Sequence, residues 1–249
     1  MLLLSLVLAA TPCDTATYPG FAWRSTAKQT AEVKKAEIDK LEEYAFTLTG
    51  TDAERKGLRT DSLLIIKGGE IVYEKYARGW DETKPHISWS VAKSVSSALT
   101  GVAVMRAGLK VDQSICDYLD GFTGKTCKVK IAHLLEFSSG IDWQEEYENE
   151  TYQVSSVISM FFGEGRRDML GFVLGHRSYA EPGAKWRYST GESLVLAAVA
   201  KAALTKVYGA DHYAWKGLFN RLGMKGVTLE EDVQGTPLGG SHLFATARD

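Results

Sequence analysis

Ser90-Val91-Ala92-Lys93 opens the most apolar helix-like stretch of the chain, which continues to Met105. On an α-helix, residues three apart lie on the same face, one turn apart. Lys93 is therefore placed over Ser90, within reach of its hydroxyl proton. This arrangement predicts a serine nucleophile that carries its own base. One alternative stays open, in which Ser90 only caps the helix and Lys93 faces solvent.

The residues after Ser90 predict a buried helix. The stretch holds almost no charge and stops at Arg106-Ala107-Gly108, a basic last turn followed by a helix-ending glycine. A helix that is apolar all round is buried. Burial matters because a lysine with its ordinary pKa of about 10.4 is protonated at pH 7 and cannot act as a base. Loss of water lowers that pKa, and a drop of about 3 units makes the amine competent.

Ser25-Thr26-Ala27-Lys28 has the same spacing in a different setting. The helix-like stretch after it, residues 31–44, is rich in charged residues and has a single apolar stripe. This pattern is typical of a surface helix that lies on a core. The apolar surroundings, and not the spacing alone, single out Ser90.

Composition is typical of a soluble globular enzyme: 45% of the 249 residues are hydrophobic, 24% are charged and the formal net charge is −2. No basic cluster with interleaved aromatic residues is present, so nucleic acid is not an expected partner. The histidines and cysteines lack metal-ligand spacing and no phosphate-binding glycine loop occurs, so we expect neither metal nor cofactor. No repeat or linker divides the chain, which favours one domain over residues 18–249.

Residues 1–17 are interpreted as a signal peptide or its remnant. Met1 to Ala10 is an apolar run interrupted only by Ser5, too short to span a bilayer but of the right length for a signal-peptide core. No basic residue precedes Arg24, so a buried N-terminal segment remains the alternative. A signal peptide predicts a periplasmic or secreted protein with no stable membrane span.

Cys116 and Cys127 are disulfide candidates if the chain is exported, because oxidising compartments allow thiols to pair. The bridge would close a short loop and stabilise the protein by about 2 to 4 kcal/mol. Two unpaired buried thiols are the alternative, and the spacing does not separate the two.

The order of expected elements indicates an α+β protein. Residues 62–66 and 71–76 are β-rich and are joined by Lys67-Gly68-Gly69-Glu70, in which the glycine pair permits the positive φ of a tight hairpin turn. After Ser90, further helical patterns and a returning strand follow, at residues 131–137, 154–162, 169–174, 194–206 and 238–244. We therefore expect an antiparallel sheet with flanking helices and a mostly helical lobe.

Two more segments hold candidate site residues. Residues 140–152 are acidic and aromatic, and form either a solvated surface loop or a cover over a cleft. Tyr188 lies at the end of an extended stretch just before a helix, where a phenol can point into a cleft. Near a lysine cation a phenol loses its proton more easily and acts as a general base or acid. The alternative is a structural tyrosine that packs its ring.

Ser90-Val91-Ala92-Lys93 followed by Tyr188-Ser189-Thr190 resembles the penicillin-recognising, β-lactamase-related serine hydrolases. These include class C β-lactamases, D-alanyl-D-alanine carboxypeptidases, family VIII esterases and 6-aminohexanoate-dimer (nylon-oligomer) hydrolases. Further matches follow in order at residues 109–119, 133–140, 181–183 and 239–249, so the resemblance covers residues 61–249. It implies a β-lactamase/transpeptidase-like fold.

The resemblance implies acyl transfer. Ser90 attacks a carbonyl carbon, Lys93 and Tyr188 carry the proton, and water then releases the acyl group. The segment from residue 141 onward is most similar to the esterases and nylon-oligomer hydrolases, which implies that Tyr147 and Trp143 help to hold the substrate. His133 lies in a helix that the family uses structurally.

Two departures from the family pattern matter. Thr190, a further substrate-binding candidate, stands where β-lactamases and peptidases have Asn, which favours ester or amide hydrolysis. The third motif, Lys or His followed by a small residue and Gly, does not occur after Tyr188. The resemblance therefore implies a C-terminally incomplete sequence without one donor of the oxyanion hole. Since losing one donor costs about a hundred- to a thousandfold in rate, we expect this polypeptide to have little activity.

The leading hypothesis is a secreted or periplasmic serine hydrolase that cleaves small esters or amides through an acyl-enzyme. A D,D-peptidase or β-lactamase acting on cell-wall peptides or β-lactams is the alternative within the enzymes. A non-catalytic protein that binds cell-wall fragments or a partner is the alternative from another class, and the joint presence of Ser90, Lys93 and Tyr188 argues against it. No oligomeric state is predicted.

Overall fold

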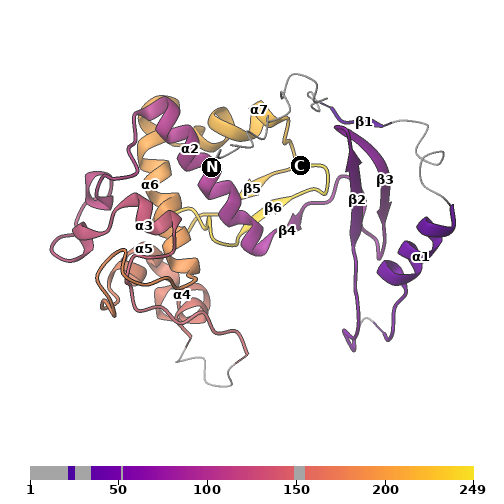
Figure 1. Ribbon diagram of the computed structural model, residues 1–249, viewed down its shortest axis with the longest axis horizontal. Helices are drawn as coiled ribbons and strands as arrows, with labels where there is room; N and C mark the ends of the chain where they lie inside the picture. The colour runs from indigo at the N-terminus through magenta and orange to yellow at the C-terminus, as the bar shows by residue number, and fades with distance from the viewer. Residues whose placement is uncertain (1–21, 26–34, 52, 149–154) are drawn as a thin grey trace, which may run out of the picture. The chain divides into compact units, whose positions relative to one another are not determined.

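The computed structural model describes residues 22–25, 35–51, 53–148 and 155–249 (Figure 1). The expected signal peptide lies outside these residues. The chain divides into two compact units, of which the first ends at Glu82 and also includes Arg248, and the second comprises Thr83 to Ala247 with Asp249. The single domain over residues 18–249 stays a prediction.

The predicted hairpin forms the centre of the first unit. Strands β2 (Ser62–Lys67) and β3 (Glu70–Tyr76) pair antiparallel, as expected. Gly68 and Gly69 between them have φ values of 59° and 79°, which residues with a side chain rarely adopt. Strand β1 (Arg24–Ser25) pairs parallel with β3 and completes a three-stranded sheet in the order β1-β3-β2.

Helix α1 (Lys35–Phe46) contacts strand β3 through one carboxylate. Glu42 accepts a hydrogen bond from the Tyr73 hydroxyl at 2.9 Å and forms an ion pair with Lys75. The Lys75 ammonium also lies 5.1 Å from the centre of the Phe46 ring. Many α1 side chains are exposed, so the surface helix predicted over residues 31–44 is confirmed over its described part.

Two long helices form the centre of the second unit (Figure 1). Helices α2 (Ala92–Ala107) and α6 (Thr190–Tyr208) pack against each other, and α6 is buried along most of its length. The prediction that α2 is buried all round is wrong, since Met105 is 73% exposed. Only one stripe of α2 is buried: Ala92, Ser96, Leu99, Thr100 and Ala103.

A small antiparallel sheet places the segment before α2. Strands β4 (His86–Ile87), β6 (Leu243–Ala245) and β5 (Thr228–Leu229) pair in the order β4-β6-β5, and β6 is the returning strand expected from the sequence. Ser88 extends the pairing by donating its N–H to a β6 carbonyl at 2.8 Å. The 3-10 turn η2 (Trp89–Val91) follows directly and leads into α2.

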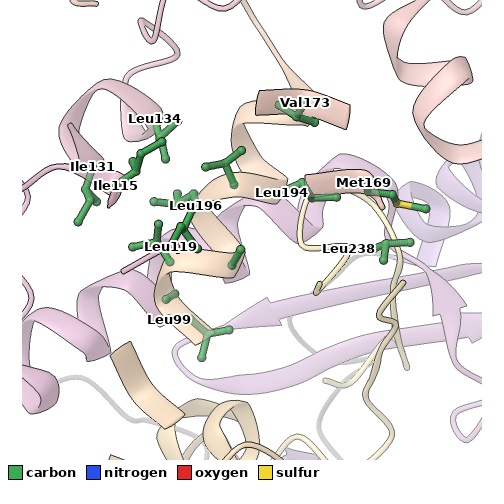
Figure 2. Close-up of a cluster of buried hydrophobic side chains, with 14 of the residues drawn as sticks. Leu99, Ile115, Leu119, Ile131, Leu134, Met169, Val173, Leu194, Leu196 and Leu238 are labelled. Carbon is green, nitrogen blue, oxygen red and sulfur yellow. The ribbon is translucent and has the colours of Figure 1, made fainter. Parts of the chain in front are cut away.

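Short helices complete the lobe and confirm the α+β class. They surround an apolar cluster to which residues of α2, α6 and several of the short helices contribute (Figure 2). No helix in the described ranges is long and apolar enough to cross a membrane. The remaining helical elements are η3 (Ile115–Asp117), η4 (Thr126–Lys128), α3 (Ile131–Leu135), α4 (Ser156–Phe162), η6 (Glu164–Arg167), α5 (Met169–Leu174), η7 (Trp215–Phe219, a π-helical turn) and α7 (Asn220–Leu222).

Cys116 and Cys127 form a disulfide in this lobe, with their Cα atoms 5.2 Å apart. Ser114 joins the same two segments through its hydroxyl group. It accepts a hydrogen bond from the Cys116 N–H at 3.1 Å and donates to the Cys127 carbonyl at 2.8 Å. The disulfide therefore closes a loop, and the hydrogen bonds of Ser114 also join the two ends of that loop.

Replacing both Cys116 and Cys127 by serine is expected to lower the free energy of unfolding by about 2 to 4 kcal/mol, because the unfolded chain regains the freedom of the open loop. Urea unfolding at constant pH measures the difference. Wild-type protein unfolded in the presence of a reductant serves as the control and should match the double variant. Equal midpoints for oxidised wild type and double variant would contradict the prediction.

Candidate functional site

Ser90 follows a residue with an uncommon backbone conformation. Trp89 has a φ of 46°, in the left-handed region where non-glycine residues are infrequent. Such conformations cost free energy and concentrate at functional sites. Helix α2 is capped at Val91 without a side-chain hydrogen bond. Ser90 is exposed and does not cap the helix, so the structure does not support the capping alternative.

The Lys93 amine contacts oxygens from three separate segments. It lies 3.2 Å from Ser90 Oγ, one turn earlier in the chain. It also lies 3.0 Å from Thr190 Oγ1 at the start of α6, and 2.6 Å from the backbone oxygen of Gly240. Helix α2 supplies the lysine, α6 the threonine, and the loop before β6 the carbonyl.

Tyr188 reaches the same hydroxyl from the other side. Its phenol donates a hydrogen bond to Ser90 Oγ at 2.9 Å, and Lys93 Nζ lies 5.0 Å from the centre of its ring. The tyrosine immediately precedes Ser189, which caps α6 through its side chain. The structure thus brings together the three residues that the sequence predicted as catalytic.

Two glycines allow the loop before β6 to approach both long helices. A Cβ on Gly239 would lie 2.2 Å from Ser96 Oγ, and one on Gly240 would lie 2.8 Å from the Thr190 side chain. Side chains at these positions would clash with α2 and α6. Ser96 Oγ also donates a hydrogen bond to the Gly239 carbonyl at 2.7 Å. The pair therefore positions the Gly240 carbonyl against Lys93.

Glu145 is a site residue that the sequence analysis did not single out. Its Oε2 accepts hydrogen bonds from Trp143 Nε1 at 2.6 Å and from the Thr190 N–H at 2.9 Å. Its Oε1 accepts from the hydroxyl groups of Thr190 and Tyr147. Nothing in the acidic run distinguishes Glu145 from its neighbour Glu146, because these contacts come from residues that are distant in the sequence or placed by the fold.

The predicted substrate-binding residues differ in exposure. Tyr147 is 59% exposed, whereas Trp143 and Thr190 are each 1% exposed. The Trp143 ring packs on Gly191, where a Cβ would lie 2.8 Å from the ring. Trp143 and Thr190 therefore support Glu145 from beneath the surface, and a substrate contact by any of the three stays a prediction.

Arg187 fastens the loop that carries Glu145 to the segment that carries Tyr188. Its guanidinium donates to Asp142 Oδ1 at 3.0 Å and to the Trp143 carbonyl at 3.2 Å. Burial opposes ionisation of Asp142, but hydrogen bonds from Arg177 and Arg187 outweigh it and hold the pKa of this carboxyl below its ordinary value. These hydrogen bonds of Arg187 hold the loop that carries Glu145 against the segment that carries Tyr188.

His133 lies apart from the Ser90 cluster. Its Nδ1 accepts a hydrogen bond from the Lys130 N–H at 3.1 Å and caps the start of α3. This contact agrees with the structural role that the resemblance implied. Within the described ranges, no group of three or more His, Cys, Asp or Glu side chains has an arrangement that could hold a metal ion.

Glu192 is a second unforeseen acidic residue, in the first turn of α6. Only 2% of it is exposed, and burial raises its pKa to about 7. Its Oε2 accepts a hydrogen bond from the Ser139 N–H at 3.3 Å. Burial therefore gives this carboxyl a pKa near neutral in the folded protein.

Comparison with known proteins agrees with the resemblance. Residues 38–249 match the family model described as beta-lactamase. The 6-aminohexanoate-dimer hydrolase of Paenarthrobacter ureafaciens is 22% identical over 220 residues, which are 85% of this chain and 55% of that protein. The chain thus spans about half the length of this curated relative.

Solved structures show the same fold. A Bacillus anthracis protein described as a candidate 6-aminohexanoate-dimer hydrolase superposes with a TM-score of 0.66 at 15% identity, over 94% of this chain and 62% of that one. FmtA from Staphylococcus aureus gives 0.61 at 12% identity, over 94% and 68%. A class C β-lactamase bound to cefoxitin gives 0.51 at 15% identity, over 75% and 55%. The predicted β-lactamase/transpeptidase-like fold is confirmed.

Replacing Glu192 by glutamine is expected to stabilise the protein more at pH 8 than at pH 5. The folded pKa of about 7 exceeds the ordinary value of 4.5, so the folded state binds more protons than the unfolded state between these values. Wild-type stability therefore falls as pH rises through this window, by about 2 to 3 kcal/mol from this carboxyl. Urea unfolding of both proteins at the two pH values measures it, and a pH-independent difference would contradict the prediction.

Proposed function

The chain belongs to the β-lactamase family of serine hydrolases, and on that premise we propose that it cleaves small esters or amides through an acyl-enzyme on Ser90. Lys93 and Tyr188 serve as the general base and acid. The observation that carries the proposal is the pair of contacts at one oxygen, since Ser90 Oγ lies 3.2 Å from Lys93 Nζ and 2.9 Å from the Tyr188 hydroxyl.

The chemistry follows from those two contacts. As Ser90 Oγ bonds to the substrate carbonyl carbon, its proton passes to the Lys93 amine, which this mechanism requires in its neutral form. Collapse of the tetrahedral intermediate breaks the bond to the leaving alcohol or amine, which takes a proton from the Lys93 and Tyr188 pair. Water then attacks the acyl-enzyme with the same groups acting in reverse, which releases the acid and restores Ser90.

Small esters and linear amides are the proposed substrates. Two of the similar proteins carry the name of 6-aminohexanoate-dimer hydrolase, an activity on a linear amide. Thr190, where related β-lactamases and peptidases have Asn, favours the same class. We further propose that this activity is periplasmic or extracellular, because a signal peptide is expected at the start of the chain. Cell-wall peptides and β-lactams are the competing substrates.

Steady-state hydrolysis of p-nitrophenyl acetate and of the 6-aminohexanoate dimer tests the proposal. The protein assayed is the product of the complete gene, called the full-length protein below. Ser90→Ala is expected to reduce kcat to the background rate, because the proposed acyl-enzyme forms on the Ser90 hydroxyl. Lys93→Met and Tyr188→Phe are each expected to lower kcat about a hundred- to ten-thousandfold, the range for loss of a general acid or base.

Ser94→Ala is the matched control, since Ser94 is an exposed serine four residues after Ser90, in the first turn of α2, and the substitution removes the same hydroxyl. It should retain wild-type kcat. Undiminished turnover by Ser90→Ala would refute the proposal. Rapid nitrocefin turnover, or stable acylation of Ser90 by penicillin, would instead assign the protein to the β-lactamases or D,D-peptidases.

A further inference from the structure

We propose that Glu145 is a positioning residue that turns the Lys93 lone pair toward Ser90 by fixing the direction in which the Thr190 hydroxyl donates its proton. The inference rests on the proposed function and adds a residue that does not touch the reacting atoms. It follows from counting donors and acceptors around Lys93.

The Thr190 hydroxyl lies between the Lys93 amine and the Glu145 carboxylate. Its Oγ1 is 3.0 Å from Lys93 Nζ and is hydrogen-bonded to Glu145 Oε1. A hydroxyl has one proton, and an ionised carboxylate only accepts. The Thr190 proton therefore points to Glu145, which leaves Thr190 Oγ1 as an acceptor toward Lys93.

In the neutral form that the proposed base catalysis requires, Lys93 has two N–H groups and one lone pair, and its Nζ faces three oxygens. The Gly240 carbonyl, at 2.6 Å, only accepts, and Thr190 Oγ1 is now also limited to accepting. The two N–H groups are used there, so the lone pair is directed at the third oxygen, Ser90 Oγ. Tyr188 already donates to that oxygen, so the proton of Ser90 is free to point to Lys93.

The proton transfer then balances without further groups. The O–H bond of Ser90 breaks as its oxygen bonds to the carbonyl carbon, and the proton joins the Lys93 lone pair. The resulting ammonium has three N–H groups for the three oxygens. If the Thr190 hydroxyl could instead donate to the Lys93 lone pair, that lone pair would be occupied and the transfer would be blocked.

The anchoring of Glu145 keeps this arrangement in place. Its Oε2 accepts from Trp143 Nε1 and from the Thr190 N–H, and both of these groups can only donate. The Thr190 N–H belongs to the first residue of α6, and a negative charge is favoured at a helix N-terminus. The carboxylate is therefore held with Oε1 toward the Thr190 hydroxyl.

Glu145→Gln is the informative substitution because it keeps shape and removes one acceptor. The single amide oxygen is required at the two N–H groups now bound by Oε2, since these can only donate, and the amide NH2 therefore turns toward the hydroxyl oxygens of Thr190 and Tyr147. That group donates, so the Thr190 proton is displaced toward the Lys93 lone pair. We expect the acylation rate to fall at least about tenfold, within the range of coupling between directly bonded groups, with the substrate dissociation constant unchanged.

The experiment measures the pre-steady-state acylation rate of the full-length protein with a p-nitrophenyl ester. It compares wild type, Glu145→Gln, Thr190→Val and the double variant. If Glu145 acts through the Thr190 hydroxyl, Glu145→Gln has less than about a twofold effect in the valine background. In a Thr190→Ser background, which keeps a hydroxyl, the tenfold effect should persist.

Glu146→Gln is the matched control, because Glu146 is exposed and its side chain accepts from the Glu148 N–H. It should keep the wild-type acylation rate. If Glu145→Gln lowers the acylation rate equally in the threonine and valine backgrounds, the inference is overturned. Glu145 would then act only by holding its loop in place. A wild-type rate for Glu145→Gln, with Ser90 still acylated, would overturn the inference alone. Absence of Ser90 acylation in wild type would overturn the proposed function as well.

Discussion

The close packing of α2, α6 and the glycine loop before β6 is the constraint on which the site depends. Ser90 lies in η2 directly before α2, which carries Lys93, and Tyr188 lies just before α6, which begins at Thr190. Neither pair forms a site alone, since each supplies only part of the hydrogen-bonding groups. The loop can join them only because Gly239 and Gly240 have no side chain to clash with either helix.

The same packing accounts for the electrostatics of the site. Lys93 contacts a hydroxyl from the turn η2 before its own helix, a hydroxyl from α6 and a loop carbonyl, all within 3.2 Å. The acceptors on two sides of the amine leave Ser90 as its third partner. Glu145 takes part from a separate loop, which Arg187 fastens to the segment before α6.

Local pattern was sufficient to predict much of the fold. The Gly68-Gly69 turn, the helix after Ser90 and the helix α6 follow from residue spacing and glycine conformations that act over a few neighbours. The Ser90 and Lys93 pair was equally local, and Tyr188 was placed by its position before a helix and by family resemblance.

Contacts between residues that are distant in the sequence could not be predicted from residue spacing. The neighbouring elements determine which face of α2 is exposed. The sequence of α2 has apolar residues on all sides, so it does not predict which face that is. The bond between Glu145 and Thr190 joins two segments 45 residues apart. Trp143 is aromatic in an acidic loop, which is compatible with exposure, and only the packing of Gly191 against its ring shows that it is buried.

The most direct measurement of Ser90 activation is peptide mapping by mass spectrometry after reaction of the full-length protein with a fluorophosphonate. If Lys93 and Tyr188 activate Ser90, one adduct forms, and it lies on the peptide that contains Ser90. An adduct on any other residue, or none under conditions that label a known serine hydrolase, would contradict that claim.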